Sequence, residues 1–136
     1  MRILDLAIAA AALLAMTSPG LAADFDGSKP FLCSSIDVAT CGPGDACARA
    51  SAAAANAPEF FVVDVQKGSV VDTSVGGGSR TSKIAHTEHL SGLLVLGGNE
   101  GSMAWVATVN EKTGRVTVAA TGDEVGFMIF GSCILR

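Results

Sequence analysis

The stretch that decides the fold class is a pair of alternating segments around a short polar turn: Met103-Ala-Trp-Val-Ala-Thr-Val-Asn110, Glu111-Lys-Thr-Gly114 and Arg115-Val-Thr-Val-Ala-Ala-Thr121. In both flanking segments alternate residues form an apolar row, which is typical of strands with one face in a core. The four residues between them end in glycine, which is typical of a hairpin turn. The stretch therefore predicts an antiparallel β-hairpin. Its inward row consists of Met103, Trp105, Ala107, Val109, Val116, Val118 and Ala120.

Strands and turns are also predicted along most of the remaining chain. Val, Ile and Thr are frequent, and 16 of the 136 residues are glycine, a composition typical of short strands joined by tight turns. Gly97–Ser102 is predicted as a loop, and the alanine-rich segment Ala48–Ala57, which Pro58 ends, is the one predicted helix. The six further strands are expected at residues 31–38, 59–65, 69–73, 81–90, 93–96 and 127–135.

These strands follow one another with short connections, which favours an antiparallel meander. We predict that the meander closes as a small barrel of roughly eight strands, and a β-sandwich is the alternative. Such a barrel is either filled by its side chains or wide enough for one small ligand, and the sequence leaves both open. Phe127–Cys133 is apolar on both faces, so both faces of the last strand are expected to be covered.

Residues 1–22 have the features of a secretory signal peptide. Arg2 supplies a positive charge, Leu6–Met16 is an unbroken apolar run, and Gly20-Leu-Ala22 fits the small-residue rule for cleavage. The run is shorter than the about 20 residues that a membrane-spanning helix needs. We therefore expect a periplasmic or secreted protein with no membrane span after cleavage, in which residues 23–136 form a single domain.

The chain has four cysteines, at positions 33, 41, 47 and 133. An even number in an exported chain indicates two disulfides, and four cysteines allow three pairings. The favoured pairing joins Cys41 to Cys47 across a turn-rich segment and Cys33 to Cys133 near the two ends of the domain, and the other two pairings stay open. Zinc is the rival interpretation, but the spacing lacks the close C-x2-C pair typical of zinc sites.

His86-Thr-Glu88-His89 is the strongest metal candidate, because histidine and glutamate are common ligands. On a strand, however, His86 and Glu88 share a face and His89 points away from it, so a solvated strand end is favoured and no metal site is predicted. Trp105, the single tryptophan, is expected in the core rather than at a ligand. These four residues, His86, Glu88, His89 and Trp105, are the candidate binding residues.

Several function classes lack support in the sequence. The net charge is −4, whereas a nucleic-acid partner requires clustered Lys and Arg. The Gly-x-Ser-x-Gly motif is missing, and Gly76–Gly78 is not followed by the Gly-Lys-Ser/Thr of a phosphate loop. Asp24-Phe-Asp26-Gly27 lacks the later acidic ligands of a calcium loop, and Asp123-Glu124 is typical of a solvated turn. We predict no catalytic residue and no cofactor.

Five local patterns together resemble a family of small exported proteins of Gram-negative bacteria to which no activity is assigned. The resemblance implies a periplasmic or secreted location and the same two disulfides, and it transfers no site residue. The patterns are Phe25-Asp-Gly-Ser-Lys-Pro30, Cys41-Gly-Pro-Gly-Asp-Ala-Cys47, Asn56-Ala-Pro-Glu-Phe60, Arg80-Thr-Ser-Lys-Ile84 and Gly126-Phe-Met-Ile-Phe-Gly-Ser-Cys133.

The chain is also loosely similar to the periplasmic inhibitors of c-type lysozyme, which are small exported barrels with disulfides. The inhibitory loop of that family has a Ser-Gly-x-x-Tyr pattern, whereas Ser91-Gly92 here precedes Leu93 and the chain has no tyrosine. We expect a non-enzymatic binding module for a protein or a small ligand. The alternatives are an enzyme inhibitor and a small hydrolase that uses the polar segment 80–90.

Overall fold

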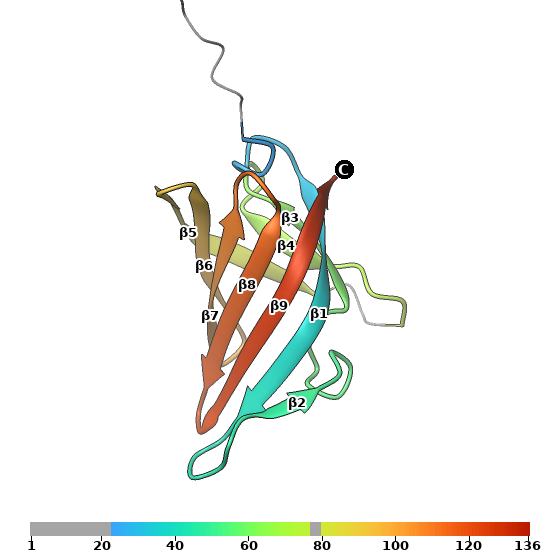
Figure 1. Cartoon of the computed structure of the whole chain (residues 1–136), viewed down its shortest axis with the longest axis vertical. Helices are drawn as coiled ribbons and strands as arrows, with labels where there is room; N and C mark the ends of the chain where they lie inside the picture. The colour runs from blue at the N-terminus through green and yellow to red at the C-terminus, as the bar shows by residue number, and fades with distance from the viewer. Residues whose placement is uncertain (1–22, 77–79) are drawn as a thin grey trace, which may run out of the picture.

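The computed structural model describes residues 23–76 and 80–136, so the predicted signal peptide lies outside the described residues. The described chain is built from antiparallel strands (Figure 1). The strands are β1 (Phe31–Cys41), β2 (Ala48–Ala50), β3 (Phe60–Asp64), β4 (Ser69–Asp72), β5 (Thr81–Leu90), β6 (Leu93–Glu100), β7 (Met103–Asn110), β8 (Arg115–Gly122) and β9 (Val125–Leu135).

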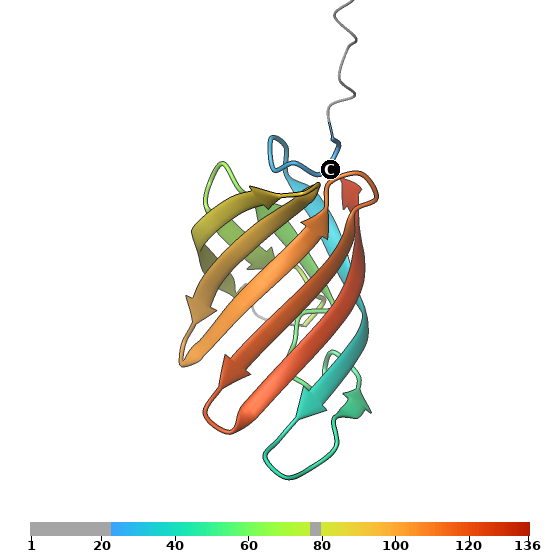
Figure 2. The same ribbon diagram turned by 60° about the vertical axis from the view of Figure 1, so that its left-hand side comes forward.

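The first and last long strands pair with each other and close the sheet. From β3 to β9 each strand pairs with the next, β1 pairs with β3, and β1 also pairs with β9 from Phe31 to Cys41. The result is a closed barrel of β1 and β3–β9, with β2 as an extra strand beside β1, and the slanted strands surround one interior (Figure 2). The predicted eight-stranded barrel is confirmed, and the β-sandwich alternative is wrong.

Both disulfides have the favoured pairing. The β1–β9 pairing that closes the barrel is called the seam. Cys33 and Cys133 are register partners on β1 and β9, and a disulfide joins their side chains across the seam. The second disulfide joins Cys41 to Cys47 across the loop between β1 and β2. The first bond therefore fastens the strand pair that closes the barrel, and the second fastens a local loop.

The predicted helix at Ala48–Ala57 is wrong. Ala48–Ala50 is strand β2, which pairs with Val38–Thr40 of β1, and the residues after it form a series of turns. Strand β1 pairs with β3 only as far as Ser34, so the rest of that edge offers free backbone groups to β2. The pairing with β1 outweighs the helix propensity of alanine, which is weak compared with tertiary interactions.

Two smaller predictions also need correction. Gly97–Ser102 was expected to be a loop, but β6 continues through Gly97 and Gly98 to Glu100, because β5 and β7 pair with it on both sides. The last strand is covered on one face only: Ile129 and Cys133 are buried, whereas the Phe130 side chain between them is 48% exposed. The inward row predicted for the 103–121 hairpin does face the barrel interior.

The N-terminal segment fills one end of the barrel. Phe25 is buried and packs edge-to-face on Phe31, with ring centroids 5.8 Å apart, and its N–H donates to the carbonyl of Glu111. Gly114 has a φ of 70°, and a Cβ there would lie 2.7 Å from the Phe25 ring, so glycine is required for this contact. The buried core at this end includes Leu94, Val109, Val116 and the Cys33–Cys133 bond.

We expect the two disulfides to stabilise the fold unequally. Cys33 and Cys133 are 100 positions apart and Cys41 and Cys47 only 6. Chain-entropy arguments assign about 5 kcal/mol to a loop of the first length and about 2 kcal/mol to one of the second. Cys33→Ala/Cys133→Ala should therefore lower the free energy of unfolding, measured with urea, by more than Cys41→Ala/Cys47→Ala does. Equal losses would contradict the role assigned to the seam.

Candidate functional site

The barrel interior contains a cavity of about 330 Å³. It reaches the end of the barrel opposite Phe25, because residues from the start of β5 and β7 and the end of β6 line it together with the turn at 55–58. Its wall is mainly apolar. The apolar lining residues include Phe61, Val63, Val70, Leu96, Met103, Trp105, Ala107, Val118, Ala120, Phe127 and Ile129.

Trp105 forms part of this wall, on the same face of β7 as Met103 and Ala107. Its register partner on β6 is Gly98, where an added Cβ would lie 2.7 Å from Cζ2 of the indole and 2.3 Å from the Lys83 carbonyl oxygen. The indole therefore lies in the space that the missing side chain leaves. Among the described residues, its buried Nε1–H has no hydrogen-bond acceptor, and such a donor is costly to leave unpaired.

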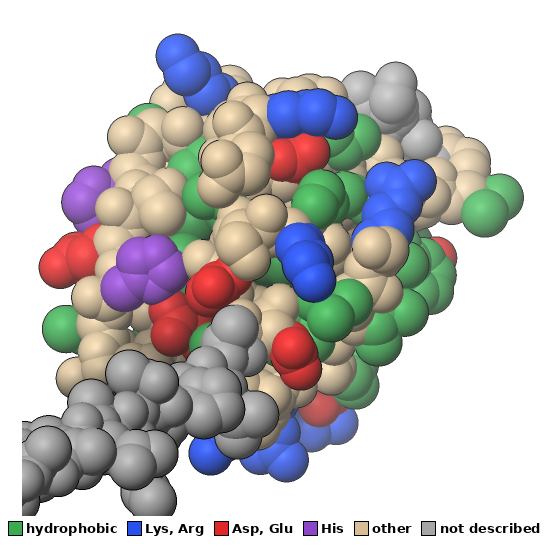
Figure 3. All heavy atoms as spheres, turned by 90° about the horizontal axis from the view of Figure 1, so that it is seen from above, with side chains coloured by type: hydrophobic (Ala, Val, Ile, Leu, Met, Phe, Trp, Pro, Cys, Tyr) green, Lys and Arg blue, Asp and Glu red, His purple; other side chains and the backbone are tan. Residues whose placement is uncertain are grey.

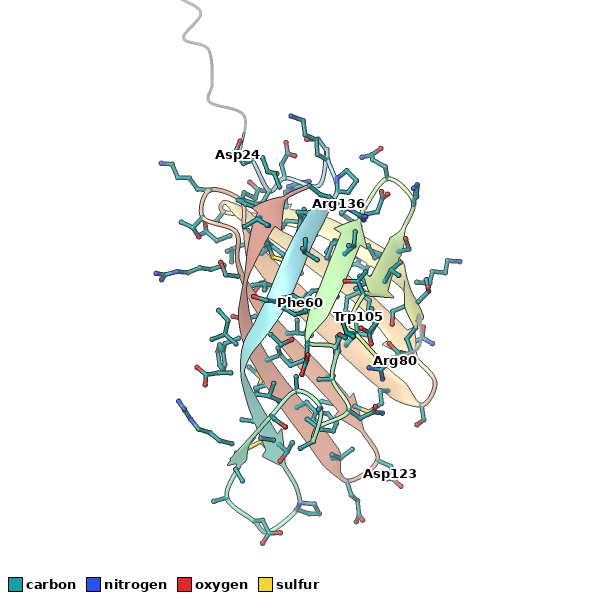
Figure 4. All side chains as sticks on the ribbon, turned by 90° about the vertical axis from the view of Figure 1, so that its right-hand side faces the viewer. Asp24, Phe60, Arg80, Trp105, Asp123 and Arg136 are labelled. Atoms are coloured by element: carbon teal, nitrogen blue, oxygen red, sulfur yellow. A yellow bond between two sulfur atoms is a disulfide. The ribbon has the colours of Figure 1, made fainter. Side chains whose placement is uncertain are left out.

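A polar cluster interrupts the apolar wall near the mouth of the cavity. Nε and Nη2 of Arg80 donate to Oδ2 of Asp72 at 3.4 and 3.2 Å, and Nη1 donates to the Asn56 carbonyl at 3.0 Å. Nη1 also lies 3.7 Å from Oε1 of Glu100, and the Ser82 hydroxyl donates to Oε2 of that carboxylate. In Figure 4, Arg80 and Trp105 lie between Asp24 at one end of the barrel and Asp123 at the other.

Asp72 is the buried charge of this cluster. Burial on its own would raise the pKa of the Asp72 carboxyl, but the hydrogen bonds from Ser74 and from Arg80, with the Arg80 charge, outweigh it and hold that pKa below its ordinary value. The backbone N–H of Ser74 donates to Oδ1 at 2.9 Å. Asp72 is therefore ionised at neutral pH and fixes the position of Arg80.

The three other candidate binding residues lie away from the cavity. Nε2 of His86 is 3.3 Å from Oε2 of Glu88, and Nδ1 of His89 contacts Oε1 of Glu111 in the turn after β7. Figure 3 shows both histidine side chains at the molecular surface, next to acidic side chains. Within residues 23–76 and 80–136, no group of three or more His, Cys, Asp and Glu is placed to hold a metal ion.

The sequence did not single out Asp72, Arg80, Ser82 or Glu100. The inward orientation of two of them could have been predicted from the period-two pattern of a strand. Asp72 lies two positions after Val70, and Ser82 lies two positions before Ile84. Arg80 lies just before β5, and Glu100 lies in the segment predicted as a loop. These residues meet only when β5 pairs with β4 and with β6, so the cluster has no local motif.

Comparison with protein-family models, curated proteins and solved structures finds no match for this chain. The resemblance to small exported proteins therefore stays a prediction. Over the part of the chain that the structure describes, no helix has the length and apolar character required to cross a membrane.

The ionised state of Asp72 predicts acid sensitivity. A carboxyl whose pKa is lowered by folding stabilises the native state above its unfolded pKa, near 4, and this contribution disappears as the pH falls through the folded value. Asp72→Asn should thus reduce the loss of unfolding free energy between about pH 5 and pH 2. Urea unfolding at several pH values measures this, and identical pH profiles for both proteins would contradict it.

Adjacent glycines of β6 offer a matched test of the Trp105 packing. Gly98→Ala should lower the free energy of unfolding by about 2 kcal/mol, as overpacking typically does, and should shift the Trp105 emission. A Cβ at Gly97 meets nothing closer than 3.6 Å, so Gly97→Ala is the control and should change neither quantity substantially. Equal effects of the two substitutions would show that Trp105 is not packed on Gly98.

Proposed function

We propose that this protein is a binding module that holds one small, mainly apolar molecule inside its barrel. The observation that carries the proposal is the cavity of about 330 Å³. Small-molecule sites typically measure about 300–1,000 Å³ and combine an apolar wall with a few polar groups. A cavity of about 150 Å³ already accepts benzene, so the present volume suits a ligand of roughly a dozen non-hydrogen atoms.

The walls of the cavity support binding without a large rearrangement. Much of the lining comes from strands that are paired with a neighbour on both sides. One of them is β7, which contributes Met103, Trp105 and Ala107. A preformed apolar pocket avoids the ordering cost that a flexible site incurs on binding. Two disulfides are compatible with an oxidising compartment, and the proposed site of action is accordingly the periplasm or the extracellular space.

Binding has more support than hydrolysis by the 80–90 segment. Ser82 faces the cavity and donates to Glu100, whereas His86 pairs with Glu88 and His89 with Glu111. A serine nucleophile needs an adjacent general base, most often a histidine, and neither histidine has Ser82 as its partner.

The proposal is tested by titrating the protein with 1-naphthylamine, a neutral apolar probe of the size that the cavity admits, and following the quenching of Trp105. Ala120→Leu places three extra carbons in the cavity and should weaken probe binding by at least about tenfold, or 1.4 kcal/mol. Ala119→Leu, one residue away on the outer face of β8, is the control and should bind as the parent does. Melting curves verify that both variants are folded.

Two results would overturn the proposal. The parent protein could leave the probe unbound at micromolar concentration, or Ala120→Leu could bind it as tightly as the parent and Ala119→Leu do. Either result would contradict a small-molecule site inside the barrel.

A further inference from the structure

We infer that the molecule held in the cavity carries a cationic head group, an ammonium on an apolar body, and that Glu100 selects it against carboxylates. The inference rests on the proposed function, since it concerns the same cavity. It follows from the charges at the mouth, from the contacts that Arg80 already makes, and from the acceptor capacity that Glu100 retains.

The charged lining residues of the cavity have a net negative charge. Within the described part of the chain they are Asp72, Arg80 and Glu100, two carboxylates and one guanidinium. Asp123 and Glu124 form the exposed turn between β8 and β9, and Figure 4 places Asp123 at the same end of the barrel. A head group that enters this end therefore meets negative potential, which attracts cations and repels anions.

Among the described residues Arg80 is the one lining cation, and three of its five N–H groups donate within the protein. Asp72 accepts from Nε and Nη2, the Asn56 carbonyl accepts from Nη1, and Glu100 lies beside Nη1. The Arg80 side chain is 37% exposed, but a ligand carboxylate bound there would lie beside the carboxylates of Asp72 and Glu100. This like charge disfavours an anionic head group.

Glu100 is the acceptor that stays accessible. Its side chain is 43% exposed, compared with 5% for Asp72. An ionised carboxylate offers about four acceptor positions, and the contacts of Glu100 are the Ser82 hydroxyl and the Arg80 guanidinium. An ammonium brings three donors and one positive charge. Binding it at Glu100 would neutralise the excess charge of the cluster while the apolar body fills the interior.

Three probes of equal chain length test the inference at pH 7 and below their micellar concentrations: decylamine, decanol and decanoate. Their affinities are measured by displacement of 1-naphthylamine. Decylamine, protonated at this pH, should bind at least about tenfold more tightly than decanoate, with decanol between them. Salt should weaken decylamine binding and leave decanol binding unchanged, because it screens only the charged ligand.

Glu100→Gln keeps the hydrogen-bonding shape and removes the charge, so it should reduce the preference for decylamine over decanoate by at least about tenfold. Glu88→Gln removes a charge on the outer wall and is the matched control, expected to retain the parent preference. Should Glu100→Gln not fold, the salt dependence of the parent protein still tests the charge.

The outcomes separate this inference from the proposed function. Decanoate that binds as tightly as decylamine, or a preference that Glu100→Gln leaves unchanged, overturns the cationic head group while binding of decanol and the naphthylamine still supports an apolar ligand. If none of the probes binds the parent protein, both the inference and the proposed function are wrong.

Discussion

The pairing of β1 with β9 is the constraint on which the rest of the structure depends. It runs from Phe31 to Cys41 and converts an open meander into a barrel, and the Cys33–Cys133 bond fastens it covalently. An open sheet of the same strands would expose two edges and would have no interior. The cavity and the enclosure of Trp105 in its wall both require this seam.

Side-chain size then determines which part of the interior is filled. Near the N-terminal segment the core contains Phe25, Phe31 and Leu94, and these large side chains leave the end of the barrel packed. Toward the other end the wall includes small residues from several elements, and Gly98 has no side chain beside Trp105. The small lining residues are Ala55, Ala57, Ala107 and Ala120. The same barrel is therefore solid at one end and hollow at the other.

Local patterns predicted the parts of this fold that depend on local interactions. The 103–121 hairpin was correct because alternation and turn chemistry lie within one short stretch. The helix expected at Ala48–Ala57 was wrong because its alternative, pairing with the free edge of β1, depends on a distant strand. Glu100 was missed for a related reason: glycines 97 and 98 suggested a loop, and only strands on both sides keep them extended.

The candidate site was less predictable than the fold because its polar residues come from separate strand ends. Asp72 ends β4, Arg80 precedes β5 and Glu100 ends β6, and the pairing of β5 with β4 and with β6 brings them to one mouth. Trp105 was placed on the correct face, but its position beside a cavity depends on what the other strands contribute. His86 and His89 were candidate binding residues because of their spacing, yet in the structure they are exposed and each contacts a glutamate, Glu88 and Glu111 respectively.

The proposed cationic ligand would give the polar cluster a role in recognition, in addition to the stabilisation that ionised Asp72 provides. Only Asp72 of the Arg80–Asp72 pair is buried, since its side chain is 5% exposed and that of Arg80 is 37% exposed. Here the pair is retained with a second carboxylate, Glu100, which leaves one negative charge without a partner in the cluster. Under the proposed function, a bound cation would be the partner of that charge, and the cluster together with its ligand would be electrically neutral.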